Sequence, residues 1–227
     1  MLAGLIAVSA YGNLTYFGVI EPAPFEFALL LPALAVALAS GLAGGLFSRL
    51  LIASLDGRSA DRASRLRRRR PVLFAAACGL AVAAIGLASG GATFGSGYAH
   101  TRGLLDGAPP EWSGYFGLKF LATWLSTWSG APGGVFAPSL AIGAALGNDI
   151  AALTAYPHAP TLIALGMASF LAAATQAPLT AFIIVMEMVD GHGMVLSLMA
   201  CALIASGVAR VLSRPFYAAL AQRIRPR

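Results

Sequence analysis

The residues best suited to chemistry form a glycine- and proline-dense loop, from Ser129 to Pro138, that lies between two apolar stretches. In hydrocarbon an unpaired backbone amide costs several kcal/mol, so irregular backbone at that depth persists only where it is buried in protein or lines a site. Gly133 and Gly134 leave no side chain over the amides, and the run from Ser139 to Leu146 predicts a helix just entered. The free amides and the positive end of this helix predict an anion-binding site.

Two later segments share the chemistry of this helix start. Like Gly134–Pro138, the segments Thr175–Pro178 and Ser213–Pro215 each place a small or polar residue before a proline and an apolar run. Proline suits the first helical turn, where its missing N–H would have been unpaired, and Thr175 or Ser213 can cap the helix. If these ends converge, they build a cage for an anion. The alternative is that they are ordinary capped helix starts at the bilayer surface.

The composition sets the environment of these segments. The chain of 227 residues is 58% hydrophobic and 11% charged, whereas a soluble domain carries roughly a quarter charged residues. We therefore expect one integral-membrane domain over residues 1–227 and no separate soluble domain. Cys78 and Cys201 lie far apart in apolar runs without metal-type or redox-type spacing, so neither a disulfide nor a metal centre is expected. No cofactor is predicted.

Apolar runs predict an all-α membrane protein. Their lengths are uneven: Ala177–Met188 is too short to span, because a crossing needs about 17 to 25 residues, whereas Phe25–Leu55 must tilt steeply. Uneven runs interrupted by glycine and proline are typical of transporters with broken helices. The predicted segments are Leu2–Ile20, Phe25–Leu55, Pro71–Ala88, Gly114–Trp128, Phe136–Ala155, Thr161–Ala174, Ala177–Met188, Met194–Leu212 and the amphipathic tail Pro215–Ile224.

The net charge of +6 is concentrated in two arginine clusters, Arg58–Arg70 and Arg210–Arg227. The positive-inside rule places both in the cytoplasm, so an even number of crossings separates them. No aromatic interleaving or folded basic domain accompanies the arginines, which argues against a nucleic-acid partner. The stretch Leu2–Ala10 lacks the charged start of a signal peptide, and the chain stays apolar after it. These features indicate a multi-pass protein, and we expect it in a bacterial inner or plasma membrane.

The Gly134–Pro138 segment (GVFAP) matches the GxFxP signature of the CLC family of chloride channels and chloride/proton antiporters. The stretches Lys119–Ile150 and Leu165–Met188 resemble the same family, as does the order of segments between Leu2 and Arg223. The resemblance covers essentially the whole chain but only the C-terminal half of the family's membrane domain. It implies broken and tilted transmembrane helices, with one repeat of an inverted-repeat pair plus the helix before it.

The resemblance also implies the residues of the site. In the family the GxFxP loop offers backbone amides to a central anion, which here places Gly134, Val135 and Phe136 at the site. A tyrosine at the start of the family's last helix supplies a hydroxyl to the same ion, and Tyr217 occupies that position. Without the resemblance, Tyr217 would be interpreted as an aromatic anchor at the membrane interface.

Two loops of the family's first half have no counterpart here. One is a GSGxP loop whose serine also contacts the ion, and the other is a GxExP loop whose glutamate gates it. The Gly95–Gly97 segment looks similar to the first loop but lacks its proline, so Ser96 is not assigned to the anion. The site predicted from this chain is therefore one half of the family's site.

Other polar residues receive structural interpretations. Glu187 lies in an apolar run close to a predicted membrane surface, so we expect a role near the helix end rather than in transport. Lys119, the only lysine, is expected to snorkel rather than to pair with an acid. The histidines show no ligand spacing and are expected in loops: His100, His158 and His192.

The predicted function is the transport of chloride, or another small monovalent anion, as a channel or chloride/proton antiporter, and not an enzymatic reaction. Because members of the family are dimers, the resemblance also implies a homodimer, with contacts through the matching segments Leu2–Ile20, Ala177–Met188 and Met194–Leu212. Small residues allow helices to approach closely, and the candidates are Ala200, Ala202, Ala205, Ser206 and Gly207.

Two alternatives remain open. The chain could be a truncated half that only packs or dimerises. It could also be an intramembrane serine hydrolase using Ser96 and His100, since a hydroxyl nucleophile needs a nearby base. No GxSxG-type elbow supports the second alternative.

Overall fold

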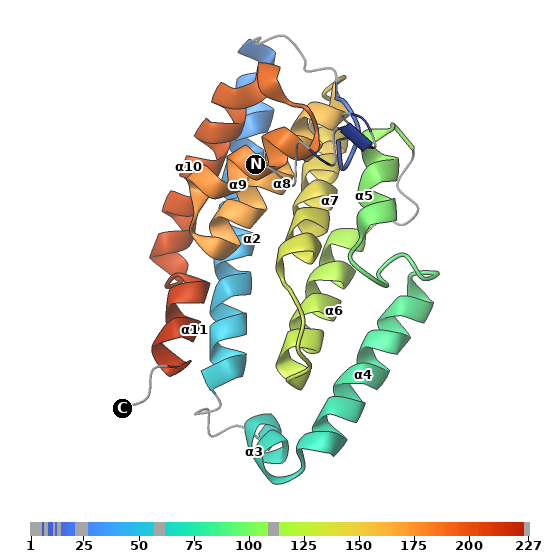
Figure 1. The fold of residues 1–227 in the computed structure, drawn as a ribbon, viewed down its shortest axis with the longest axis vertical. Coiled ribbons are helices and arrows are strands. Elements are labelled where there is room, and N and C mark those ends of the chain that lie inside the picture. Colours follow the sequence, from blue (N-terminus) through green and yellow to red (C-terminus); the bar gives the residue numbers. More distant parts are fainter. Residues whose placement is uncertain are drawn as a thin grey trace.

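Helices make up the regular structure of the described chain, as the apolar runs predict (Figure 1). The computed structural model describes residues 6, 9–10, 12, 15–20, 27–56, 62–108 and 114–224, and none of these lies in a strand. The helices are α2 (Phe27–Asp56), α3 (Arg62–Arg69), α4 (Pro71–Ala88), α5 (Tyr98–Leu105), α6 (Tyr115–Ser129), α7 (Phe136–Thr154), α8 (Ala159–Thr175), α9 (Pro178–Met188), the 3₁₀ turn η1 (His192–Met194), α10 (Val195–Leu212) and α11 (Phe216–Ile224).

Helix boundaries follow the sequence pattern closely. The run predicted at Pro71–Ala88 coincides with α4. Pro178 is the first residue of α9, and Pro215 directly precedes α11. Two helices were missed. The arginine-rich helix α3 and the mixed-polarity helix α5 carry no long apolar run, so the pattern that identified the others is absent from them. Most of the predicted Leu2–Ile20 run lies outside the described residues.

Within the described part of the chain, four segments are long and apolar enough to cross a membrane: Phe27–Ser54, Pro71–Ala88, Phe136–Thr154 and His192–Leu212. The 30-residue α2 is about 45 Å long at 1.5 Å per residue. This length exceeds the ~30 Å hydrocarbon core, so α2 must tilt. The helices α8 and α9 are apolar but shorter, as expected for broken helices.

The core is built around α8, whose residues from Thr161 to Ala174 are all buried. Helices α2, α7, α9 and α10 pack on it (Figure 1). Glycines permit the closest approach, between α7 and α8. A Cβ added to Gly143 would lie 2.9 Å from the Met167 Cα, and one added to Gly147 would lie 2.8 Å from the Ile163 Cα. Backbone therefore meets backbone at this crossing.

The dimer prediction requires the small residues of α10 to face outward, and not all of them do. Ala202, Ala205 and Ser206 are buried inside the protomer. A Cβ on Gly41 of α2 would lie 2.9 Å from the Ala205 carbonyl oxygen, which shows that α2 is the neighbour of this α10 face. The prediction is wrong for these three residues because sequence alone does not reveal which neighbour a small face contacts.

Both arginine clusters lie toward the same end of the molecule. Helices α3 and α11 both occupy the lower part of Figure 1, where α2 and α10 end. Arg58, Arg225 and Arg227 lie outside the described residues. The shared position agrees with the predicted even number of crossings between the clusters, while the side of the membrane stays a prediction.

Candidate functional site

The loop between α6 and α7 leads directly into an uncapped helix start. Gly130 ends α6 in the left-handed region with φ 87°, and its amide donates to the Thr127 carbonyl oxygen at 3.2 Å. Val135 is the N-cap residue of α7, and no side chain caps the helix. Because the first amides of a helix have no intrahelical acceptor, the start of this 19-residue helix presents free donors and the positive dipole end.

The two glycines before Val135 are not required by the protein's own packing. A Cβ on Gly133 or Gly134 would meet no atom within 4 Å, and neither residue has a positive φ. Both line a cavity of about 230 Å³, together with Lys119 and Pro138. Glycine lets a ligand approach the backbone closely, so the missing side chains keep the amides accessible from this cavity.

A second cavity of about 230 Å³ borders the same helix turn. Phe136 and Ala137 line it from α7, and Ser96 and Thr101 line it from the α5 region. The Thr101 hydroxyl is fully buried and has no hydrogen-bond partner among the described residues. The first turn of α7 is thus bordered by two cavities, each with polar groups in its lining.

The three predicted helix starts border one cluster of buried apolar side chains. Val135 precedes α7, Ala174 lies near the end of α8 just before α9, and Phe216 begins α11; all three belong to this cluster. The Gln176 Nε2 donates to the Ser213 carbonyl oxygen at 2.8 Å, which ties the α8–α9 turn to the α10–α11 turn. The prediction that these starts converge is therefore supported at the level of the backbone segments.

Neither of the two capping predictions holds. The Thr175 hydroxyl accepts the Ala177 amide at 3.3 Å, but Thr175 is the last residue of α8 and Ala177 is the N-cap of α9 with no side-chain cap, so the prediction that Thr175 caps α9 is wrong. Ser213 ends α10, and its hydroxyl bonds to the Ser48 hydroxyl at 3.3 Å and the Arg214 carbonyl oxygen at 3.1 Å. The prediction that Ser213 caps α11 is wrong, because Ser213 is the C-cap residue of α10 and α11 begins only at Phe216.

Tyr217 lies in the first turn of α11 and is half exposed. Its ring packs against the Phe216 ring, with centroids 5.3 Å apart. Tyr217 does not line either of the two cavities beside α7. The structure thus places Phe216, the neighbour of Tyr217, in one cluster with Val135. That the Tyr217 hydroxyl binds the same anion as the α7 amides stays a prediction.

Lys119 is buried, and the prediction that it snorkels is wrong. Its side chain is 2% exposed, and its Nζ donates to the carbonyl oxygens of Thr93 at 2.8 Å and Gly95 at 2.7 Å. The glycine-rich loop after α4 turns these carbonyls inward, so the ammonium finds partners without reaching the surface. The sequence offered one indication that Lys119 has buried partners, namely that this lysine lies inside an apolar run.

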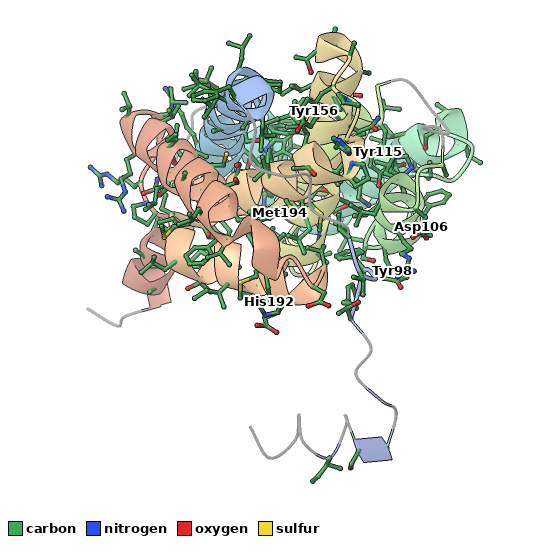
Figure 2. The ribbon with its side chains drawn as sticks, turned by 90° about the horizontal axis from the view of Figure 1, so that it is seen from above. Tyr98, Asp106, Tyr115, Tyr156, His192 and Met194 are labelled. Atoms are coloured by element: carbon green, nitrogen blue, oxygen red, sulfur yellow. The ribbon has the colours of Figure 1, made fainter. Side chains whose placement is uncertain are left out.

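The remaining polar residues have structural positions. His100 is buried in α5, not in a loop, and stacks on the Tyr115 ring at 3.6 Å between centroids; Figure 2 labels Tyr115 beside this helix. Glu187, in the last turn of α9, is exposed, and its Oε1 lies 3.7 Å from the Nε2 of His192. Figure 2 shows His192 at the outer rim of the protein. The predicted position of Glu187 near a helix end is thereby confirmed. Among the described residues no His, Cys, Asp and Glu side chains gather into a metal site.

Known proteins resemble this chain over most of its length. The family model for the voltage gated chloride channel matches residues 1–210. The H(+)/Cl(-) exchange transporters ClcA of Klebsiella pneumoniae and Citrobacter koseri are 37% identical over 115 residues, which cover 48% of this chain and 24% of each relative.

Two solved structures share the fold. A CLC-type fluoride/proton antiporter superimposes with a TM-score of 0.77 at 23% identity, over 94% of this chain and 52% of that one. A slow cyanobacterial Cl⁻/H⁺ antiporter gives a TM-score of 0.69 at 26% identity, over 98% and 53%. The chain thus spans about half the length of the solved relatives, and the all-α membrane fold of broken and tilted helices is confirmed.

Proposed function

Because the chain belongs to the voltage-gated chloride channel (CLC) family, we propose that it forms part of a unit that carries chloride, or another small monovalent anion, across a membrane. The proteins that it resembles include proton exchangers of chloride and of fluoride. The observation that carries the proposal is the uncapped start of α7, preceded by two glycines that face open space. Residues 1–227 act as one membrane domain in this proposal.

The anion site consists of the amides around Gly134, Val135 and Phe136 and the hydroxyl of Tyr217. Backbone amides and the positive end of α7 supply the attraction without a cofactor or a metal. The buried ammonium of Lys119, which lines the same cavity as Gly134, adds positive potential on that side. The segments that carry the amides and the tyrosine meet at one apolar cluster, which supports their action on one ion.

The alternatives have less support. The Ser96 hydroxyl accepts the Tyr98 amide at 3.3 Å, His100 stacks on Tyr115, and the relatives are exchange transporters, so a hydrolase is not favoured. A half that only packs or dimerises would give the open cavity beside Gly133 and Gly134 no role. Nothing in the structure favours that reading over anion transport.

Assembly and orientation complete the proposal. The two arginine clusters face the cytoplasm of a bacterial cell, and the protein forms a homodimer through outward faces of α9 and α10. On α10 an apolar stripe remains exposed after α2 and α8 have packed: Leu196, Ala200, Leu203, Gly207 and Val211. This stripe replaces the buried small residues as the expected contact between protomers.

Chloride binding by single variants tests the site. The complementary N-terminal half of the family's membrane domain is supplied as a fusion or in trans, and affinity is measured by calorimetry. Tyr217→Phe should weaken binding about two- to tenfold, because a lost hydrogen bond typically costs about 0.5 to 1.5 kcal/mol. Gly134→Ala should weaken binding and leave folding intact, since its methyl group meets no protein atom.

A matched control removes a hydroxyl elsewhere. Tyr156 follows α7 at its far end (Figure 2), about 28 Å from the helix start at 1.5 Å per residue. Tyr156→Phe should leave chloride affinity unchanged. If Tyr217→Phe and Gly134→Ala both bind chloride as the unmodified protein does, the anion lies elsewhere and the proposed site is wrong.

A further inference from the structure

A groove at the end of α2 and α10 brings together three arginines from three different elements. Arg49 belongs to α2, Arg210 to the last turn of α10, and Arg214 to the connection between α10 and α11. All three side chains are exposed and line the groove, whose volume is about 380 Å³. Ser213, which lies between Arg210 and Arg214 in the sequence, also lines the groove.

The positive charge of this groove is not balanced by the protein. The ion pairs among the described side chains join Arg102 to Asp106 and His192 to Glu187 and Asp190, and none involves the three groove arginines. A guanidinium group presents a planar fork of donors that matches phosphate oxygens in a bidentate manner. Three such groups around one groove therefore favour a phosphate group over a small spherical ion.

The rest of the groove is apolar. Ile52, Val211 and Leu212 line it beside the arginines, and the Val211 side chain is 87% exposed. The groove also lies where two membrane-spanning segments end, Phe27–Ser54 and His192–Leu212. A ligand that fills it must combine a negative head with a hydrocarbon part and reside at the membrane interface.

We propose that this groove binds an anionic phospholipid, with the headgroup phosphate between Arg49, Arg210 and Arg214 and an acyl chain along Val211 and Ile52. Basic pockets between membrane helices at the cytoplasmic side are suited to such headgroups. A free phosphate would gain nothing from the apolar lining, which is why the lipid is favoured. The lipid site goes beyond the transport proposal and stands even if the anion site at α7 fails.

Native mass spectrometry of the full chain in mild detergent tests this proposal. The protein is offered phosphatidylglycerol and phosphatidylcholine with identical acyl chains, and the lipid adducts are quantified. Phosphatidylglycerol should be retained preferentially. An arginine near an anionic lipid surface contributes about a fivefold gain in affinity, so the triple variant Arg49→Gln, Arg210→Gln, Arg214→Gln should lose ~100-fold.

The charge-matched control replaces Arg65, Arg69 and Arg70, which are exposed around α3, by Gln. This control should retain phosphatidylglycerol. Equal retention of the two lipids, an unaffected groove variant, or an equal loss in the control would overturn the site. Release of the lipid by millimolar inorganic phosphate would also overturn it, in favour of a soluble anion.

If the triple variant does not fold, the single variant Arg214→Gln provides the test. It should weaken the retention of phosphatidylglycerol about fivefold. Retention equal to that of the unmodified protein would contradict the proposal.

Discussion

The crossing of α7 and α8 leaves no room for a single added methyl group. Gly166→Ala places a Cβ 3.0 Å from the Gly147 amide nitrogen and even closer to the Gly143 carbonyl oxygen, and Gly143→Ala places one 2.9 Å from the Met167 Cα. Carbon atoms pack favourably at about 3.5 to 4.0 Å. The helices must therefore separate by at least about 0.6 Å, because backbone atoms have no rotamer that yields.

A separation of this size has a large energetic effect. A gap of about 0.5 to 1 Å forfeits a quarter to a half of the dispersion energy of the atoms that face it. Overpacking a tight core typically costs about 1 to 3 kcal/mol and occasionally more. We expect Gly166→Ala to lie at the upper end, at about 3 kcal/mol, because every residue of α8 from Thr161 to Ala174 is buried.

Unfolding in detergent, followed by circular dichroism against added denaturant, measures this cost. Gly79→Ala on α4 is the matched control, since its Cβ would meet no atom within 4 Å, and its stability should change by less than about 1 kcal/mol. The double variant Gly143→Ala, Gly166→Ala should cost less than the sum of the single variants, because one displacement relieves both overlaps. Equal stability of Gly166→Ala and Gly79→Ala would refute the reasoning.

Three further predictions follow from the same structure. Lys119→Met leaves two loop carbonyls unpaired and should lower the free energy of unfolding by about 3 kcal/mol or more; an unchanged thermal unfolding midpoint would contradict the contact. Cysteines at Arg65 and Arg225 should resist a membrane-impermeant label in intact cells, and labelling of either without permeabilisation would overturn the proposed orientation. Cysteines at Ala200 and Gly207 should crosslink between protomers while a cysteine at Ala205, which is buried against α2, should not; crosslinking at Ala205 alone would place the dimer contact elsewhere.

Sequence reasoning located the helices that carry long apolar runs. Helix α4 coincides with its predicted run, and α7 begins at Phe136, where the loop chemistry placed its start. These predictions succeed because chain-local rules determine them: apolar length, a proline in the first turn and glycine before a helix. Helices α3 and α5 carry no long apolar run, so these rules do not reveal them.

The sequence predicted the backbone segment that forms the candidate site, but not the side chains and loops that surround it. The GVFAP segment identified the uncapped start of α7, but nothing local to Lys119 reveals that Thr93 and Gly95 turn their carbonyls toward it. The same limit applies to Ala205, whose small side chain suits a neighbouring protomer as well as α2. Contacts between distant segments depend on the three-dimensional arrangement, which periodicity does not encode.

The buried ammonium of Lys119 has a consequence for how the protein is made. Helix α6 has only 15 residues and carries this charge within its second turn. It is therefore a poor substrate for insertion on its own, because a lysine opposes insertion, by up to about 2.5 to 3.5 kcal/mol at a helix centre. Helix α4, which lies before the short helix α5 in the chain, is uncharged over 18 residues, and the loop between α4 and α5 supplies both carbonyl partners. We expect α4 and α6 to leave the translocon together as a hairpin, so that loss of the lysine's partners reduces the amount of protein reaching the membrane before it changes any transport rate.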